Sequence, residues 1–155
     1  MEEKIEKAIL ESYDSLYRLA YCYVRDENDA MDIVQESVYK AIRGKRQVKE
    51  EQFIKTWLYK ITIRTAIDFL RKKKREVVGL EDYEKGQEDC YQNFDLENAM
   101  KLLDEREKAV ITLRYFEDRK LSEVAEILGE NGNTVKSILY RTLKKLRIHL
   151  GREAL

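Results

Sequence analysis

The chain has 155 residues, enough for one medium domain or two small ones, and its 30 basic and 30 acidic side chains give a formal net charge of zero. This balance excludes binding to a polyanion by net charge alone. One histidine and two widely spaced cysteines form no pattern typical of a catalytic or metal site, so we expect no enzyme, cofactor, metal or small-molecule substrate. The charged start MEEKIEKAIL and the lack of a long apolar run predict a cytoplasmic protein.

Charged residues gather in alternating blocks along the chain. Residues 1–36 carry a net charge of −6 and residues 37–75 carry +10, whereas residues 76–98 carry −7 and residues 99–155 carry +3. Two basic blocks separated by an acidic one indicate two contacts with a polyanion such as DNA. Solvated helix faces produce similar runs, so composition leaves that alternative open.

Apolar residues recur with helical periodicity along a chain that contains no proline. In the N-terminal half the pattern predicts helices over residues 4–25, 28–43 and 52–74. In the C-terminal half it predicts helices over residues 96–103, 104–117, 121–128 and 133–149. Residues 76–95 are acidic and aperiodic, and a structureless segment of that length is unusual inside one compact domain. We therefore predict an all-α protein of two small helical domains, residues 4–75 and 96–150, joined by a flexible linker.

Polar residues at the expected helix starts supply caps. Asp26 and its polar neighbours are typical of the start of the helix over 28–43, and Asp95, Ser122 and Asn133 are expected to cap later helices. The helical period places apolar side chains inward on every helix. This inward set includes Ile42, Phe53 and Phe116.

Residues 121–147 (LSEVAEILGENGNTVKSILYRTLKKLR) pair a short apolar helix with a longer basic one across a polar turn. This pattern is typical of a helix-turn-helix, whose second helix enters the major groove with its first turns at the base edges. An amphipathic hairpin without a DNA function is the alternative. The residues placed to contact bases or phosphates are Thr134, Lys136, Ser137, Tyr140, Arg141, Lys144, Lys145 and Arg147.

The basic helix over 52–74 interleaves aromatic residues with lysine and arginine. Aromatic rings that stack on bases, beside cations that follow the backbone, suit single-stranded or opened DNA. For Phe53 and Trp57, packing in the core is at least as good an explanation. One domain is thus expected to read duplex DNA and the other to hold melted DNA.

Three segments closely resemble the extracytoplasmic-function (ECF) class of bacterial RNA polymerase sigma factors, group IV of the sigma-70 superfamily. They are DENDAMDIVQESVYKAI and EQFIKTWLYKITIRTAIDFLRKKKRE, which correspond to sigma region 2, and LLDEREKAVITLRYFEDRKLSEVAEILGENGNTVKSILYRTLKKLR, which corresponds to sigma region 4. The resemblance covers about residues 5–150, with the motifs in the expected order.

The resemblance implies partners and roles for individual residues. It implies docking on the clamp coiled coil of the largest polymerase subunit through Asp29, Asp32, Gln35 and Glu36, and a further contact with the polymerase flap. It implies contact with the melted −10 element through Lys40, Gly44, Val48, Trp57, Lys60 and Arg64. It implies reading of the −35 duplex through Thr134, Lys136, Ser137, Tyr140, Arg141, Lys144 and Lys145. It also implies an anti-sigma factor, commonly membrane-anchored, that covers the polymerase-binding surfaces.

Two departures from the family pattern fall in region 4. Asn133 stands where a small residue or glycine commonly precedes the recognition helix, and the usual proline near Asp104 is absent. The remaining alternative is a stand-alone helix-turn-helix regulator that binds duplex DNA as a dimer, with half-sites about one helical turn apart.

Overall fold

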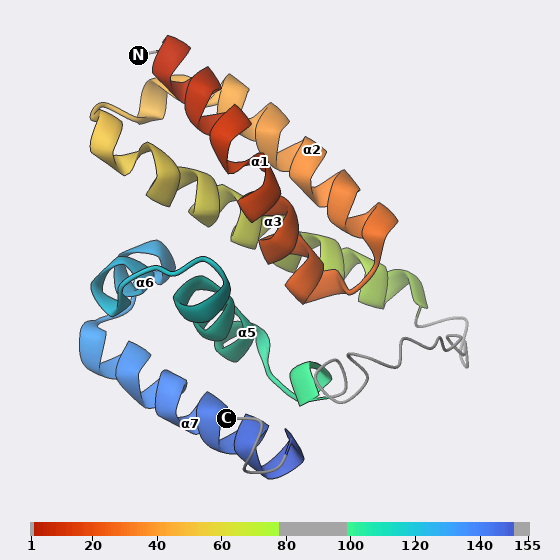
Figure 1. Ribbon diagram of the computed structural model, residues 1–155. Coiled ribbons are helices and arrows are strands. Elements are labelled where there is room, and N and C mark those ends of the chain that lie inside the picture. The colour runs from red at the N-terminus through yellow and green to blue at the C-terminus, as the bar shows by residue number, and fades with distance from the viewer. Residues whose placement is uncertain (1, 78–98, 151–155) are drawn as a thin grey trace.

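The computed structural model describes residues 2–77 and 99–150, and every regular element within these ranges is helical (Figure 1). A first unit comprises α1 (Glu2–Val24), α2 (Glu27–Arg43) and α3 (Ile54–Val77), with two short 3-10 turns, η1 (Lys45–Gln47) and η2 (Glu51–Phe53), between α2 and α3. A second unit comprises α5 (Glu105–Ile111), a π-helical turn η3 (Thr112–Phe116), α6 (Leu121–Leu128) and α7 (Gly132–Leu150). This confirms the predicted all-α fold of two small helical domains.

The three helices of the first unit pack against one another around a shared apolar core. Leu16 and Leu19 of α1, Val34 of α2 and Leu58 of α3 are almost completely buried. Burying such a side chain contributes about 1.5–3 kcal/mol, so a few of them outweigh the modest helix propensity of each segment. Asp26 caps α2 as predicted, because its side chain accepts a hydrogen bond from the Asp29 amide at 2.9 Å.

Two residues expected to face inward in the first unit are exposed. Ile42 follows the buried Ala41 and lies about 100° around the helix from it, outside the stripe that α2 buries. Phe53 ends the 3-10 turn η2 and so is not part of α3, whose apolar face begins at the buried Ile54. Both predictions of an inward position were wrong, because each residue falls just outside the face that the neighbouring helices cover.

The helix predicted over 104–117 changes type at its middle. Asp104 caps α5 in a reciprocal capping box with Glu107, and after Ile111 the chain continues as the π-helical turn η3. In this turn the Glu117 amide donates to the Thr112 carbonyl, five residues back, at 2.9 Å. The wider turn rotates its last residue and the one after it relative to a regular α-helix, so Phe116 is 46% exposed and Glu117 is buried. The prediction that Phe116 faces inward was wrong for this reason.

The turn between α6 and α7 differs from the predicted capping. Lys120, not Ser122, precedes α6, and its amide donates to the Glu123 carboxylate at 2.9 Å. Gly129 ends α6 with φ +70°, a conformation that residues with a Cβ rarely adopt. Asn131, not Asn133, caps α7, because its Oδ1 accepts from the Thr134 amide at 2.8 Å.

Most of the predicted linker, and Asp95 with the start of the predicted helix over 96–103, lie outside the described residues. Residues 99–101, within that helix, are helical as expected. No helix within residues 2–77 and 99–150 is both long enough and apolar enough to span a membrane.

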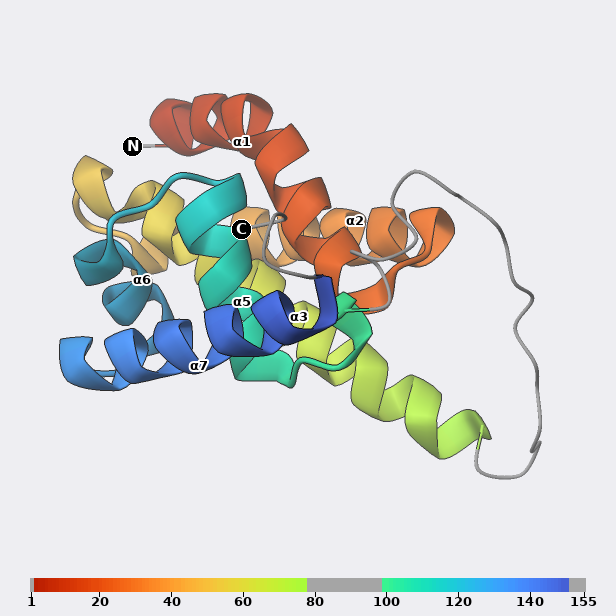
Figure 2. The same cartoon turned by 60° about the horizontal axis from the view of Figure 1, so that its bottom comes forward.

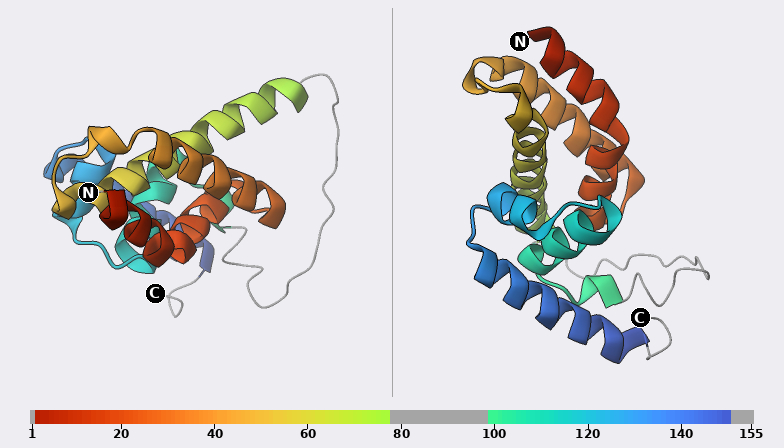
Figure 3. Two further views of the ribbon diagram at one scale, coloured as in Figure 1. Left: turned by 90° about the horizontal axis from the view of Figure 1, so that it is seen from above. Right: turned by 60° about the vertical axis from the view of Figure 1, so that its left-hand side comes forward.

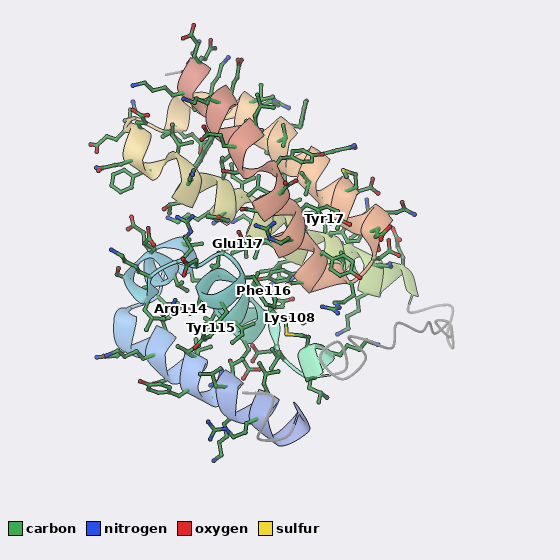
Figure 4. The ribbon with its side chains drawn as sticks, viewed as in Figure 1. Tyr17, Lys108, Arg114, Tyr115, Phe116 and Glu117 are labelled. Atoms are coloured by element: carbon green, nitrogen blue, oxygen red, sulfur yellow. The ribbon has the colours of Figure 1, made fainter. Side chains whose placement is uncertain are left out.

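The two units pack against each other. Helix α3 lies against α6, and α1 contacts α5 and η3 (Figures 1 and 3). Glu117 lies at this boundary, where it pairs with Arg18 of α1 (Figure 4). Helix α7 runs along the side of the second unit that faces away from α1–α3 (Figures 1 and 3), and Figure 2 shows it from that side, in front of α5. The predicted DNA-reading helix is therefore on the outside, whereas α3 faces the second unit.

Candidate polymerase and nucleic-acid interfaces

The outer face of α2 carries the residues predicted to bind core polymerase. Asp32, Gln35 and Glu36 are exposed within one turn of each other, and none of them bonds to another described residue. Asp29 differs, because its side chain is only 19% exposed and its carboxylate accepts a hydrogen bond from Lys73 Nζ at 2.7 Å. This pair ties the start of α2 to the last turns of α3. Three of the four side chains are thus open to a partner, and Asp29 also stabilises the fold.

The loop between α2 and α3 forms a wall of a pocket of about 340 Å³. Gly44 ends α2, and its amide donates to the Lys40 carbonyl at 2.9 Å. Neither of these two residues lines the pocket, whereas three other predicted −10 residues do. The lining residues are Gln47, Val48, Lys49, Glu50, Phe53, Thr56, Trp57, Lys60 and, from α6, Glu126.

The aromatic residues of this pocket have unequal burial. Trp57 is half-buried and packs against the core, so it serves the fold as well as the pocket. Phe53 is exposed at the same pocket and contributes little to the core. Val48 is buried although it lies in the loop. The pocket therefore combines one exposed ring, one half-buried ring and the Lys60 cation, and rings beside cations are the groups that can stack on an unstacked base.

Two further residues of the predicted −10 set have different surroundings. Lys40 Nζ donates to Thr65 Oγ1 at 3.0 Å and so links α2 to α3. Arg64 is exposed and lines, together with Lys60, a second pocket of about 340 Å³ between α3 and the second unit. Glu130 lies in the opposite wall of that pocket. Glu130 pairs there with Arg106, so this part of α3 faces both acidic and basic side chains of the second unit.

The outer face of α7 presents most of the residues predicted to read −35 DNA. Lys136, Tyr140 and Lys144 form one exposed stripe at spacings of four residues, and Ser137 is exposed beside them. Thr134 is half-buried in the first turn, where its amide is capped. The opposite face buries residues that hold α7 to the domain, as expected from the sequence. These are Val135, Ile138, Leu139 and Leu146.

Arg141 and Lys145, also predicted to bind −35 DNA, have an intramolecular partner. Both pair with the fully buried carboxylate of Glu107 on α5, Arg141 Nε at 2.7 Å and Lys145 Nζ at 2.8 Å. Burial of this carboxylate raises its pKa, but hydrogen bonds from Lys145, from the Asp104 amide and from Arg141 outweigh burial and hold the pKa of Glu107 below its ordinary value. Glu107 is therefore a stable counter-ion beneath α7.

Sequence reasoning missed Glu107, although a signal was present. Glu107 lies three and four residues before Val110 and Ile111, both buried, so the helical period places its carboxylate on the inward face of α5. An acid at an inward position requires a cationic partner, because an unpaired buried charge is costly. The lysines and arginines of α7 could have been identified as the source of that partner.

The sequence matches the family descriptions of sigma-70 region 2 over residues 9–76 and of sigma-70 region 4 over residues 99–147. It is 50% identical over 151 residues to RNA polymerase sigma factor SigV of Bacillus subtilis (strain 168), covering 95% of this chain and 91% of that protein. It is 31% identical to the ECF RNA polymerase sigma factor SigW of the same strain over 161 residues, covering 92% of this chain and 81% of SigW.

Two solved structures have a similar fold. The sigma factor RpoE from Bartonella quintana, in complex with the anti-sigma factor NepR, aligns with a TM-score of 0.80 at 21% identity, covering 95% of this chain and 96% of that one. CnrH, in complex with the cytosolic domain of CnrY, aligns with a TM-score of 0.72 at 18% identity, covering 93% and 85%. The sequence relationships and the two matched regions together show that the chain belongs to the ECF group of RNA polymerase sigma factors.

Proposed function

We propose that this sigma factor docks on core RNA polymerase through the exposed face of α2 and directs it to promoters through two separate DNA contacts. The observation that carries the proposal is the state of Asp32, Gln35 and Glu36. All three are exposed on one face of α2, and none bonds to another described residue. Three polar side chains that the fold does not use are available to a partner. The resemblance names that partner as the clamp coiled coil of the largest subunit.

The two DNA contacts are assigned to different units. We assign the melted −10 element to the pocket between the α2–α3 loop and α3, since it gathers Phe53, Trp57 and Lys60. We assign the −35 duplex to the outer face of α7, since Lys136 and Tyr140 are exposed there in its first turns. Membership of the sigma family disfavours a stand-alone dimeric regulator. The first unit matches sigma-70 region 2, and a regulator that acts without polymerase gives that region no role.

We further propose that an anti-sigma factor controls the chain. The support is the likeness of its fold to RpoE and CnrH, which were solved in complexes with NepR and CnrY respectively. Such a partner would cover the α2 face proposed to bind polymerase. Anchoring of that partner in a membrane, and a cytoplasmic location for this chain, are expectations from the family resemblance.

The test is a titration of fluorescently labelled chain with bacterial core RNA polymerase. The variant Asp32→Ala/Gln35→Ala is expected to weaken binding at least tenfold, because it removes adjacent contacts from the proposed interface. Glu3→Ala/Glu6→Ala is the matched control, since it removes two exposed carboxylates from α1, outside the proposed face. Equal binding by the α2 variant and the wild type would contradict the assigned docking face. Absence of binding by the folded wild-type chain would contradict the polymerase contact itself.

A further inference from the structure

The carboxylate of Glu107 lies beneath two cations of the recognition helix and is 0% exposed. Arg141 Nε donates to its Oε2 at 2.7 Å, and Lys145 Nζ donates to its Oε1 at 2.8 Å. Hydrogen bonds between ionised partners at these distances are about twice as strong as neutral ones. Each cation is therefore held at a defined point along α7.

Glu107 is itself fixed at its backbone amide and at its carboxylate. Its amide donates to Asp104 Oδ1 at 2.8 Å, and its Oε1 accepts from the Asp104 amide at 3.0 Å. This capping box anchors the residue in the first turn of α5. Because both the backbone and the carboxylate are committed, Glu107 acts as a rigid counter-ion and not as a mobile surface charge.

The two cations keep hydrogen-bonding capacity for another ligand. The side chain of Arg141 is 51% exposed and that of Lys145 is 41% exposed, so both reach solvent. Arg141 meets Glu107 through Nε, which leaves the two terminal amino groups of the guanidinium to other acceptors. Lys145 carries three donors and uses one of them on Glu107.

We infer that Glu107 positions Arg141 and Lys145 for selective reading of the −35 element, although it contacts no DNA itself. The inference rests on the proposed role of α7. An unrestrained arginine reaches many phosphates and base edges, whereas one held by Glu107 reaches few, so holding it favours one DNA sequence over others. One anion against two cations also leaves the cluster with a single net positive charge, which limits sequence-independent attraction to DNA.

The neighbouring stripe of α7 lacks such a counter-ion. Lys136, Tyr140 and Lys144 are exposed, and neither lysine pairs with an acid within the described residues. Lys144 is expected to meet phosphates without regard to sequence. The recognition helix thus combines a restrained edge beside α5 with an unrestrained outer edge, and only the restrained edge depends on Glu107.

The experiment compares DNA discrimination by polymerase holoenzymes that contain the intact chain or a variant. Selection of duplexes with a randomised −35 segment by the wild-type holoenzyme first defines the preferred sequence. Competition between that sequence and a scrambled one then gives a specificity ratio at several salt concentrations. Glu107→Gln keeps the shape of the side chain and removes its charge. We expect the ratio to fall about tenfold and the salt dependence to steepen by about one phosphate contact.

Two control variants separate the positioning of Arg141 and Lys145 from two other effects, the loss of any carboxylate and the loss of any contact with DNA. Asp118→Asn removes a carboxylate from an exposed pair with Arg114 and is expected to leave the ratio unchanged. Lys144→Ala is expected to weaken both sequences equally. Thermal unfolding and core-polymerase binding, which the proposal places on α2, report whether each variant is folded. If Glu107→Gln does not unfold cooperatively, the specificity ratio of Glu107→Asp tests the inference instead. This variant keeps the charge on a shorter side chain, and we expect a loss of about threefold in the ratio.

The outcomes distinguish the inference from the function on which it rests. A folded Glu107 variant that discriminates as well as the wild type overturns the inference alone, even if it is less stable. A wild-type holoenzyme that enriches no −35 sequence overturns the proposed role of α7, and the inference with it. If Glu107→Gln lowers stability and also lowers the specificity ratio and steepens the salt dependence, the result supports positioning of Arg141 and Lys145 by Glu107. A purely structural ion pair would change stability only.

Discussion

Arg18 of α1 forms a two-pronged ion pair with the buried carboxylate of Glu117, which follows η3. Arg18 Nε donates to Oε2 at 3.1 Å and Nη2 donates to Oε1 at 3.2 Å, although 99 residues separate the two in sequence. Two contacts flank this pair, a hydrogen bond from the Tyr23 hydroxyl to the Glu105 carbonyl at 3.2 Å and the Arg119 guanidinium over the Tyr59 ring. Polar, directional contacts thus contribute to joining the two units.

Replacing Arg18 by alanine should loosen this junction. The change leaves the Glu117 carboxylate buried without its guanidinium, which costs about 1–3 kcal/mol. We expect the two units to separate more often, seen as a larger radius of gyration in small-angle scattering of the free chain. Arg18→Ala/Glu117→Gln should recover part of the loss, because no unpaired charge remains. An unchanged radius in Arg18→Ala would show that other contacts dominate the junction.

The same variant should bind single-stranded DNA more readily. Glu126 of α6 lines the pocket that holds Phe53, Trp57 and Lys60, so the second unit and a melted strand compete for one surface. Loosening the junction removes that competition. We expect severalfold tighter binding of the free Arg18→Ala chain to short single-stranded DNA of random sequence, measured by fluorescence anisotropy. Equal affinities would mean that the second unit does not restrict access to the pocket.

Local sequence signals predicted most of the helices, and tertiary contacts decided the rest. The apolar period located α2 and α7 to within a few residues, because amphipathic faces repeat every 3.6 residues, whereas the predicted cap was correct for α2 only. The helical period predicted neither the π-helical turn η3 nor the ion pair of Glu117 with Arg18, a partner in the other unit. A local pattern contains no information about a partner on another helix, and Phe116 was misplaced because the chain leaves the α-helical period at η3.

The candidate site shows the same division. Exposure of Asp32, Gln35 and Glu36 followed from helical spacing, since all three lie opposite the apolar stripe of α2. The ion pairs of Arg141 and Lys145 did not, because both residues fit an exposed basic face by spacing alone. Their partner Glu107 lies on another helix. Distances between helices are set by packing, so the spacing showed that these cations lie outside the apolar face of α7 and could not show that Glu107 restrains them.

Glu107 should make the second unit less stable in acid. Its carboxylate accepts hydrogen bonds from Arg141 and Lys145 of α7 and from the Asp104 amide at the start of α5. Its folded pKa lies below the ordinary value of 4.5, so its contribution is present above that value and is lost as the pH falls through the folded pKa. Urea unfolding from about pH 7 to about pH 3 should show a smaller acid-induced loss in Glu107→Gln than in the wild type. Identical pH profiles would contradict this.

The start of α7 gives a test of the capping assignment. Asn131→Ala removes the acceptor of the Thr134 amide and should destabilise the second unit by about 1 kcal/mol. Asn133→Ala is the matched control, because Asn133 lies exposed inside the first turn of α7 and should change stability by less than about 0.5 kcal/mol. Chemical denaturation measures both. A larger loss in Asn133→Ala than in Asn131→Ala would restore the cap expected from the sequence.

Phe53 offers the cleanest test of the proposed −10 pocket, because the residue is 42% exposed and contributes little to the core. Phe53→Ala should leave the melting temperature nearly unchanged, yet reduce holoenzyme affinity for single-stranded DNA by about 1–3 kcal/mol, the contribution of one stacked base. Tyr115→Ala, which removes an exposed ring of η3 (Figure 4), should change neither quantity. Trp57→Ala is less informative, since Trp57 packs against the core and its loss affects fold and pocket together. Undiminished DNA affinity in Phe53→Ala would remove the exposed ring from the proposed site and leave only the half-buried Trp57 to stack on a base.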